Sequence, residues 1–462
     1  MRPFHRHLLS ALALSSCLLS PAAWAESLAD AMVSAYRHSA LLDQNRALLR
    51  AADEDVATAV SALRPVIQWV AEHRYTQVEG IDNTQTSLNL AAQLTLFDFG
   101  RRQIAIDAAK ETVLATRESL IGVEQDVLLG AVQAYLSVRS AAQQVALQQN
   151  SVNLLVQEEQ AARDRFDVGE ITVTDVSLAS ARLAATRAGL AAARGNYEVA
   201  IEAYLAATGH KPGDLSAPPA LPKLPASLEA AQATGQGTHP AIRQMQRQVA
   251  AAELGVAAAQ AERNPTIAAS VGVGTTRADN AMTGDKEWRD SASAGLSMSQ
   301  TIYSGGRLSA GLRRAMAMRD STRAGLLQSS RMVAQQIGTA YARIDVAQAQ
   351  IRAIDEQISA ARQAYEGVRE EAMLGARTTL DVLDAEQDLL TARADRISAE
   401  ADLQLAHYQL LAAMGLLTVE HLKLGIPTYD PSAYYNAVRN APYTSPQGDS
   451  LDRVLRAIGK SD

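Results

Sequence analysis

An internal duplication constrains the fold of this chain of 462 residues more than any other feature. Matching positions recur at an offset of 206 residues: the segment 97–101 at 303–307, Ala134-Tyr135 at Ala340-Tyr341, and Gly169 at Gly375. Upstream the offset is 200, at Pro65 and Pro265, so the second copy holds six additional residues before Tyr303. Self-similarity at a fixed offset is the signature of a repeated structural unit, so the same architecture is expected twice.

Each copy predicts the same order of elements. A helical segment ends at a proline, which cannot continue a helix, and two short strands, a long helix and a return helix follow. The predicted helical segments are 28–64 and about 239–263, the strands about 66–78, 86–97, 266–277 and 291–303, the long helices about 101–166 and 307–372, and the return helices about 172–208 and 378–414. A helix of about 65 residues would extend about 100 Å. The prediction is a mainly α protein with a small β part, in which long coiled-coil helices pair into a tall α-barrel.

The duplication also sets the predicted domain boundaries. Residues 26–209 form the first repeat and residues 238–425 the second. The segment 210–237 contains five prolines and is interpreted as a linker between the repeats. The tail 426–462, with four prolines, is predicted to be irregular.

The predicted strands alternate between apolar and polar side chains, which is the period of a strand with two different faces. The apolar set comprises Ile67, Trp69, Ala71, Tyr75, Leu88, Leu90, Ala92, Leu94, Leu96, Ile267, Ala269, Val271, Val273, Ala294, Leu296, Met298 and Ile302. Four strands cannot close a barrel, yet this apolar face needs a non-aqueous neighbour. Strands of this kind suit a membrane barrel assembled from several chains, and the alternative is a soluble sheet packed on one face.

The first 25 residues are interpreted as a secretory signal peptide. A positively charged start precedes the apolar run 8–19, and Ala23-Trp24-Ala25 fits the small-x-small cleavage rule, so the mature chain is expected to start at Glu26. An alternative is lipidation at Cys17, because the preceding residues resemble a lipobox. No later apolar stretch approaches the roughly 20 residues that a spanning helix needs.

Composition excludes several classes of function. Acidic residues outnumber basic ones by 50 to 43 and no basic run occurs, so nucleic-acid binding has no electrostatic support. A single cysteine excludes a disulfide scaffold and a cysteine-based zinc site. No phosphate-binding loop or metalloprotease motif is present, so neither a cofactor nor an enzymatic activity is expected.

The signal peptide, the duplicated helix–strand–strand–helix–helix unit and the Phe-Asp-Phe-Gly-Arg segment at 97–101 together resemble the TolC family of outer-membrane efflux proteins. The resemblance covers about residues 27–420. Its most specific segments are the two turns with the helix starts that follow them, 166–176 and 374–384. The second segment is similar in particular to the type I secretion members of the family.

The resemblance implies a homotrimer in the outer-membrane lipid of a Gram-negative cell, with a β-barrel of 12 strands, four from each chain, and an α-helical tunnel through the periplasm. Its implied partners are a periplasmic adaptor, or membrane fusion protein, and an inner-membrane ABC or proton-driven transporter. The expected function is therefore an exit duct for type I protein secretion, multidrug efflux or both. The alternatives are a duct for small molecules only and a periplasmic coiled-coil adaptor.

The resemblance also implies roles for particular residues. Asp381 and Asp384, three residues apart on one helix face, match stacked carboxylate rings at the periplasmic entrance. Arg377, Thr174 and Asp175 match residues that hold this entrance shut through links between helices. The turns match the regions that contact the adaptor, at Val168, Gly169, Leu374 and Gly375.

The same residues also allow simpler interpretations. The spacings Thr172-x-x-Asp175 and Thr378-x-x-Asp381 fit a helix N-cap followed by an acid at the third helical position. Asp384 lies beyond the first turn, so capping does not explain it. Arg377 is also compatible with an ordinary exposed turn residue.

Overall fold

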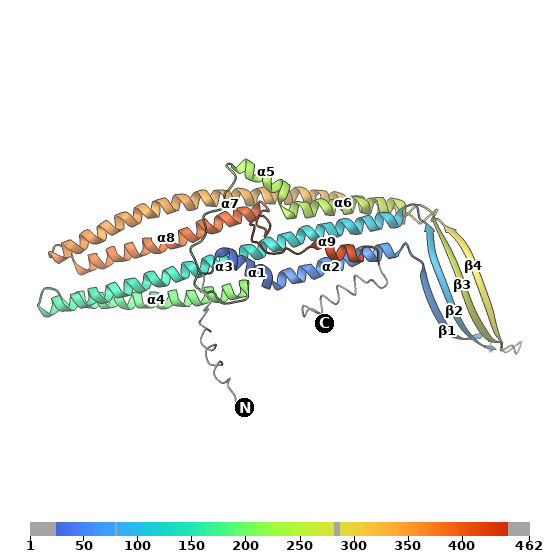
Figure 1. Ribbon diagram of the computed structural model, residues 1–462, viewed down its shortest axis with the longest axis horizontal. Coiled ribbons are helices and arrows are strands. Elements are labelled where there is room, and N and C mark those ends of the chain that lie inside the picture. The colour runs from blue at the N-terminus through green and yellow to red at the C-terminus, as the bar shows by residue number, and fades with distance from the viewer. Residues whose placement is uncertain (1–24, 79–80, 281–286, 442–462) are drawn as a thin grey trace, which may run out of the picture. The chain divides into compact units, whose positions relative to one another are not determined.

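The computed structural model of the protein describes residues 25–78, 81–280 and 287–441 (Figure 1). The predicted signal peptide, with Cys17, and the tail residues 442–462 lie outside the described residues. The chain divides into two compact units. The hairpin unit comprises the residues up to Ser39, Val127–Leu224 and Tyr341–Gln409, and the sheet unit comprises Ala40–Asp126, Pro225–Ala340 and the residues from Leu410 onward.

The helices of the two copies match at the two offsets of the duplication to within one residue, whereas β4 ends four residues before the position that matches the end of β2. The first copy contains α1 (Leu28–His38), α2 (Ala40–Ser61), β1 (Val66–Val78), β2 (Ile81–Phe97), α3 (Arg101–Asp167) and α4 (Val173–Thr208). The second contains α5 (Leu228–Thr238), α6 (Pro240–Ala261), β3 (Thr266–Asn280), β4 (Trp288–Ser299), α7 (Arg307–Met373) and α8 (Thr379–Ala413), and α9 (Pro431–Val438) follows in the tail. The predicted repeated order and the mainly α fold with a small sheet are confirmed.

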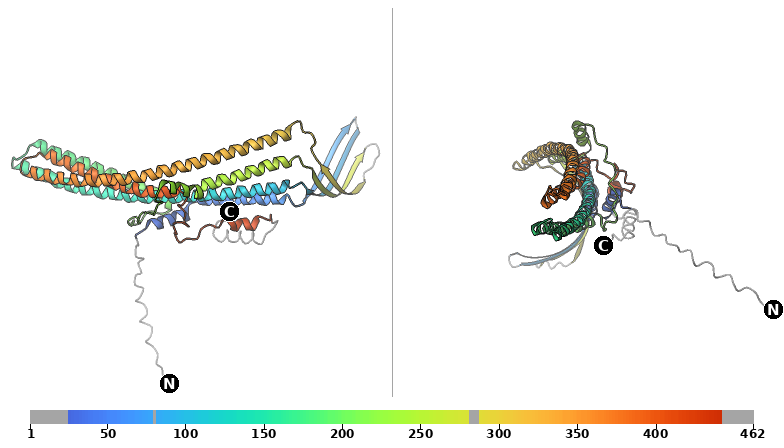
Figure 2. Two further views of the ribbon diagram at one scale, coloured as in Figure 1. Left: turned by 90° about the horizontal axis from the view of Figure 1, so that it is seen from above. Right: turned by 90° about the vertical axis from the view of Figure 1, so that its left-hand side faces the viewer.

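Long helices pair with return helices in the hairpin unit. Here α3 runs beside α4, and α7 runs beside α8 (Figures 1 and 2). The α3–α4 pair shares a buried core that includes Leu155 and Leu183, and the α7–α8 pair packs around Tyr365 and Leu389. Neither long helix contains a proline, so no residue interrupts the hydrogen-bond ladder over 67 residues.

The four strands form one antiparallel sheet in the order β1-β2-β3-β4 within the sheet unit. Its register places Trp69 opposite Leu90, Leu90 opposite Val273, and Val273 opposite Ala292. Directly opposite residues point to the same face of a sheet, so most of the predicted apolar set shares one face. Two members do not follow this pairing: Leu96 lies at a register shift, where Phe97 is opposite Ile267, and Ile302 lies beyond β4, which ends at Ser299 rather than at the predicted residue 303. That face is bare in the described chain, since the side chains of Trp69 and Leu296 are 69% and 71% exposed.

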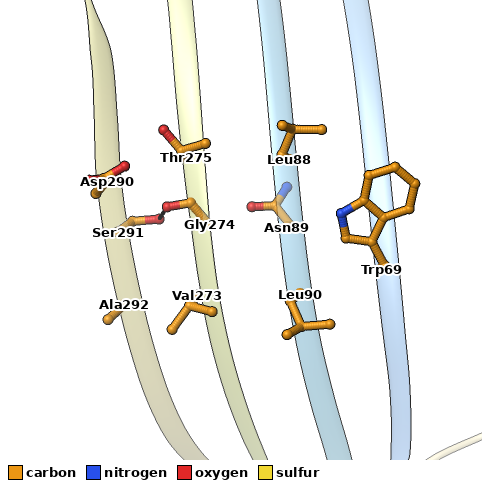
Figure 3. Close-up of a pocket in the computed structure, with 10 residues that line it drawn as sticks. All are labelled: Trp69, Leu88, Asn89, Leu90, Val273, Gly274, Thr275, Asp290, Ser291 and Ala292. Carbon is orange, nitrogen blue, oxygen red and sulfur yellow. Dashed lines mark hydrogen bonds between the residues drawn. The ribbon is translucent and has the colours of Figure 1, made fainter.

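The opposite face of the sheet carries small and polar side chains. Asn89 lies opposite Gly274, which in turn lies opposite Ser291 (Figure 3). A Cβ atom at Gly274 would lie 2.2 Å from Asn89 Oδ1 and 2.9 Å from the carbonyl oxygen of Leu88. Glycine is therefore required at this position so that the Asn89 side chain can lie across the neighbouring strand.

The structure differs from the sequence prediction at the first helical segment of each copy. The predicted helix 28–64 is interrupted at Ser39, whose backbone is extended between α1 and α2. In the second copy, α5 forms within residues assigned to the linker, and His239 separates it from α6. Pro240 occupies the first turn of α6, where its missing N–H costs nothing.

The tail also differs from the prediction, because residues 431–438 form α9 rather than an irregular segment. Within the sheet unit this helix packs on α2. The Tyr434 hydroxyl donates to Glu54 Oε1 at 2.7 Å, and the Arg64 guanidinium donates to the carbonyl oxygens of Asn440 and Ala441. A short helix without a strong pattern of its own is thus stabilised by contacts with distant residues.

Glu26, the expected first residue of the mature chain, is held by the hairpin unit. Its backbone N–H donates to the carbonyl oxygen of Asp214 at 2.8 Å, and its own carbonyl accepts from the Ser216 N–H at 2.9 Å. Its carboxylate accepts a hydrogen bond of 2.5 Å from the Tyr204 hydroxyl. Across the described residues, none of the helices combines the length and the apolar character needed to cross a membrane.

Candidate gate and selectivity site

The two turns between long and return helices have the same backbone geometry. Gly169 and Gly375 adopt φ angles of 79° and 75°, in the left-handed region that favours glycine. After each glycine an N–H reaches back to the helix end: Glu170 N donates to the Arg165 carbonyl, and Ala376 N donates to that of Glu371, both at 2.9 Å. These bonds define a Schellman motif, which satisfies the last carbonyl groups of α3 and α7.

The return helices begin with the same capping box. Asp175 Oδ2 accepts from the backbone N–H of Thr172 at 3.0 Å and from its hydroxyl at 2.7 Å. Asp381 Oδ2 accepts the corresponding bonds from Thr378 at 2.9 and 2.8 Å. The capping interpretation of both acids is therefore confirmed. These bonds hold the pKa of each carboxyl below its usual value, so both acids are ionised near neutral pH.

Asp384 lies one turn beyond the cap of α8 and has a different partner. Its Oδ1 lies 2.6 Å from Arg182 NH2 of α4. The Asp384 side chain is 59% exposed, whereas that of Arg182 is 26% exposed. The two predicted acids therefore have different direct partners, because Asp381 accepts hydrogen bonds from the neutral Thr378 whereas Asp384 pairs with the charged Arg182.

Arg377 does not contact Thr174 or Asp175 within the chain. Its Nε lies 2.8 Å from Glu371 Oε2, at the end of α7, and both side chains are about half exposed. Thr174 is exposed in the first turn of α4. The predicted latch residues thus lie at the two turns, but the part of the chain that the structure describes does not bring Arg377 to the first turn.

Exposed apolar side chains mark both turns. Val168 is 71% exposed and Leu374 is 85% exposed, each next to the glycine of its turn. Val173 and Met373, at 63% and 61%, extend the apolar surface along the helix ends. Val168 and Leu374 occupy corresponding positions in the two copies, and exposed apolar groups of this kind are typical of a surface that another molecule covers.

Two contacts of the site were not predicted from the sequence. Besides the Arg182–Asp384 pair, the Ser151 hydroxyl of α3 donates to the buried Glu386 Oε1 at 2.7 Å. Burial raises the pKa of Glu386, which Ser151 and the nearby charge of Arg182 lower in part. The sequence does place Arg182 on the same helix face as Asp175, two turns further along. It does not show which acid Arg182 pairs with.

The site contains nothing that would hold a metal ion. In the described ranges, no three His, Cys, Asp or Glu side chains are grouped in a way that could bind one. Its chemistry is that of charged and hydrogen-bonding groups on helix ends, which can attract ions and link helices.

Comparison with known proteins places this geometry in a family. The family model described as "Outer membrane efflux protein" matches residues 32–210 and 236–416, one match for each copy. The chain belongs to the outer membrane efflux protein family.

Three relatives align with 72% to 93% of the chain. It is 34% identical over 433 residues to the outer membrane efflux protein BepC of Brucella suis. This alignment covers 93% of this chain and 94% of BepC. It is 24% identical to the outer membrane protein TolC of Escherichia coli, over 80% of this chain and 78% of TolC. The alkaline protease secretion protein AprF of Pseudomonas aeruginosa is also 24% identical, over 72% and 70% of the two chains.

Solved structures share the fold. CusC superposes with a TM-score of 0.73 at 20% identity, over 84% of this chain and 92% of CusC. VceC of Vibrio cholerae superposes with a TM-score of 0.71 at 20% identity, over 84% and 96%. As a member of the outer membrane efflux protein family, the chain is an exit duct of the outer membrane that extends into the periplasm. The family match decides against the adaptor alternative.

Proposed function

We propose that three copies of the chain close one duct. The described sheet ends in β1 on one side and β4 on the other, and each of these strands has a partner on one side only. Unpaired edges and a bare apolar face are both unfavourable in water. Pairing β1 of one copy with β4 of the next would complete the edges, give 12 strands in a trimer, and turn the apolar face towards outer-membrane lipid.

We propose that the turn of the second copy forms the selective entrance of the duct. The observation that carries this proposal is the repeated capped turn, with Asp381 held ionised at the start of α8. Asp384 follows on the same face of the helix. In a trimer these two positions give two rings of three carboxylates, and rings of carboxylates at a constriction favour cations over anions.

The closed state is proposed to depend on links between neighbouring copies. Within its own chain Arg377 pairs with Glu371, and its link to Thr174 or Asp175 is proposed to be made with the adjacent chain. Such ion pairs and hydrogen bonds exchange easily, so a recruited partner could replace them and let the return helices swing outward. Transport through this duct requires no catalytic step.

The exposed tips are proposed to receive a periplasmic adaptor, recruited together with an inner-membrane transporter. Support comes from Val168 and Leu374, which are exposed in equivalent positions and are held by the fixed turns at Gly169 and Gly375. An adaptor that covered both tips would bury apolar surface next to the charges of the entrance. Recruitment and opening would then be coupled at one place.

The cargo is proposed to comprise proteins, small molecules or both. The Pseudomonas aeruginosa relative is named an alkaline protease secretion protein, and the Brucella suis relative, at 34% identity, is named an efflux protein. The alternative is a duct for small molecules only.

A clean deletion strain separates these cases when its secreted proteome is compared with its susceptibility to detergents and dyes. Loss of a few exported proteins with unchanged susceptibility would identify a secretion duct. Hypersensitivity with an intact secretome would identify an efflux duct, and both defects together would identify a shared exit. Wild-type behaviour of the deletion strain in both assays would contradict the proposal. The condition is that the protein, expressed from a plasmid, forms heat-sensitive trimers in the outer membrane.

The proposed latch is tested in planar bilayers. Arg377→Ala is expected to raise the resting conductance of the trimer, because the closed entrance loses one charged link in each chain. Arg369→Ala is the matched control, since Arg369 is another half-exposed arginine near the end of α7 and pairs with Glu158 at 3.6 Å. An unchanged closed state in Arg377→Ala would remove this residue from the latch.

A further inference from the structure

The Arg182–Asp384 pair links the return helices of the two copies. Arg182 lies on α4 and Asp384 on α8, 202 residues later, and their nitrogen–oxygen distance of 2.6 Å makes this a short charge-assisted hydrogen bond. Within the hairpin unit it therefore joins two helices that are not neighbours in the sequence.

Buried neighbours fix the position of this pair. Leu183, next to Arg182, and Leu383, next to Asp384, belong to one hydrophobic cluster with Ala179. Leu183 and Leu383 are 3% and 2% exposed, so the backbones of α4 and α8 are packed together at this level. An exposed ion pair on mobile side chains contributes little, but here packing holds both helices and so keeps the two charges together.

The pair changes the charge that the entrance presents. Asp381 accepts hydrogen bonds from the neutral donors of Thr378, and the nearby Arg377, whose charge also acts on Asp381, makes its own ion pair with Glu371. Arg182, by contrast, pairs directly with Asp384 and compensates its charge. We propose that Arg182 is a selectivity-determining residue, which neutralises the Asp384 ring and leaves the Asp381 ring as the main source of cation preference. This inference rests on the proposed function, because it requires these residues to face the path of the ions.

The consequence is an opposite response of the two partners. Arg182→Gln would leave the Asp384 carboxylate of each chain without its positive partner. The Asp384 ring of a trimer would then change from neutral to a charge of about −3. Asp384→Asn would leave one arginine in each chain and change the same ring to about +3. If Arg182 did not compensate the Asp384 carboxylates, Asp384→Asn would change the ion preference and Arg182→Gln would not.

The experiment measures reversal potentials of the full trimer in planar bilayers across a potassium chloride gradient. Arg182→Gln is expected to raise the cation-to-anion permeability ratio about threefold and Asp384→Asn to lower it by a similar factor, since ring charge governs ion preference. The double variant Arg182→Gln/Asp384→Asn is expected to return close to the wild-type ratio. This reversal is the result that a general loss of structure cannot produce.

Arg194→Gln is the matched control. Arg194 lies on α4, 12 residues beyond Arg182, and donates to the Gln149 side-chain oxygen at 2.9 Å rather than to an acid. The control removes the same charge from the same helix about 18 Å away, so its permeability ratio is expected to stay near the wild-type value. Equal shifts in Arg182→Gln and Arg194→Gln, or shifts of the same sign in Arg182→Gln and Asp384→Asn, would overturn the inference.

Asp381→Asn separates this inference from the proposed function. If Asp381→Asn lowers the cation preference while the Arg182 and Asp384 variants behave like wild type, the inference fails and the proposed entrance stands. If Asp381→Asn also leaves the ratio unchanged, the proposed entrance fails as well. All variants are first checked for heat-sensitive trimers in the outer-membrane fraction.

Discussion

The two copies place an acid and an arginine at corresponding positions and give the pair different environments. Asp53 corresponds to Glu253 at the offset of 200, and Arg117 corresponds to Arg323 at the offset of 206. In the second copy, Arg323 NH2 lies 2.5 Å from Glu253 Oε1, and both side chains are about half exposed. In the first copy Asp53 is fully buried, and neither of its carboxylate oxygens has a hydrogen-bond partner among the described residues.

The tail causes this difference. Tyr429 and Tyr435 pack against the cluster of Leu49, Val56 and Val113 next to Asp53, and the Arg117 guanidinium lies 5.2 Å from the centre of the Tyr435 ring. Burial raises the pKa of Asp53 to about 6, although the charge of Arg117 lowers it. The comparison shows that a covering segment can override an inherited pair of charges, because desolvation outweighs attraction at this depth.

The largest expected effect concerns the helix junctions of the two copies. A Cβ atom at Gly415 would lie 2.7 Å from the Cα of His239 and 2.9 Å from the carbonyl oxygen of Thr238, whereas at Gly209 it would meet the His38 side chain at 3.0 Å. Backbone cannot move aside as a side chain can, and both glycines have positive φ angles. Gly415→Ala is expected to cost about 3 kcal/mol and Gly209→Ala about 1 kcal/mol of the free energy of unfolding in urea.

Equal losses in these two variants would contradict the distinction between the junctions. The same urea titrations, followed by far-UV circular dichroism, provide the test. A control in Gly213→Ala, where a Cβ atom would meet nothing within 4 Å and φ is not positive, is expected to behave like wild type.

Next in size is the pH dependence that Asp53 introduces. Because its folded pKa is raised, the folded chain retains a proton that the unfolded chain loses, so this group lowers stability as pH rises from about 4 to about 6. Asp53→Asn removes this slope and is expected to stabilise the protein by up to about 3 kcal/mol at pH 8, with little effect at pH 4. Denaturation at both pH values measures the difference.

Glu253→Gln is the control from the second copy. Its ion pair is exposed, so the expected change is at most about 0.5 kcal/mol at either pH value. A stabilisation by Glu253→Gln as large as that by Asp53→Asn would show that burial under the tail is not the cause.

The smallest expected effect tests the similarity of the two turns rather than a difference. Thr172→Ala removes the N-cap of α4 and is expected to cost about 1 kcal/mol. Thr378→Ala removes the same bonds from α8, so a similar loss is expected in urea denaturation. Serine at either position preserves the capping hydroxyl and should restore stability. A clear inequality between the two alanine variants would show that one turn depends on contacts beyond its cap.

Much of the fold could be predicted because its signals are local. The prolines at 65 and 265, the glycines of the turns and the alternation of the strands each act within a few residues. The start of α8 follows from Thr378 and Asp381, three positions apart. The missed interruption at Ser39 and the short helix α9 have weak local signals, and their contacts come from residues far along the chain.

The candidate site divides in the same way. Its capped turns and the positions of Asp175 and Asp381 followed from sequence spacing. The partners of Arg377 and Asp384 did not, because an exposed arginine can meet any acid that the fold brings within reach. Only the packed structure shows Glu371 beside Arg377 and Arg182 beside Asp384.

The sequence alone therefore determined the duplication, the helix and strand order, the two faces of the sheet and the capped turns, since these depend on interactions between near neighbours in the chain. Tertiary structure decided which charges are paired, which are compensated and which are buried. Asp53 and Glu253 demonstrate this, because matched positions reach opposite environments through one covering helix. Charge state depends on desolvation and on partners hundreds of residues away, and no local pattern encodes these.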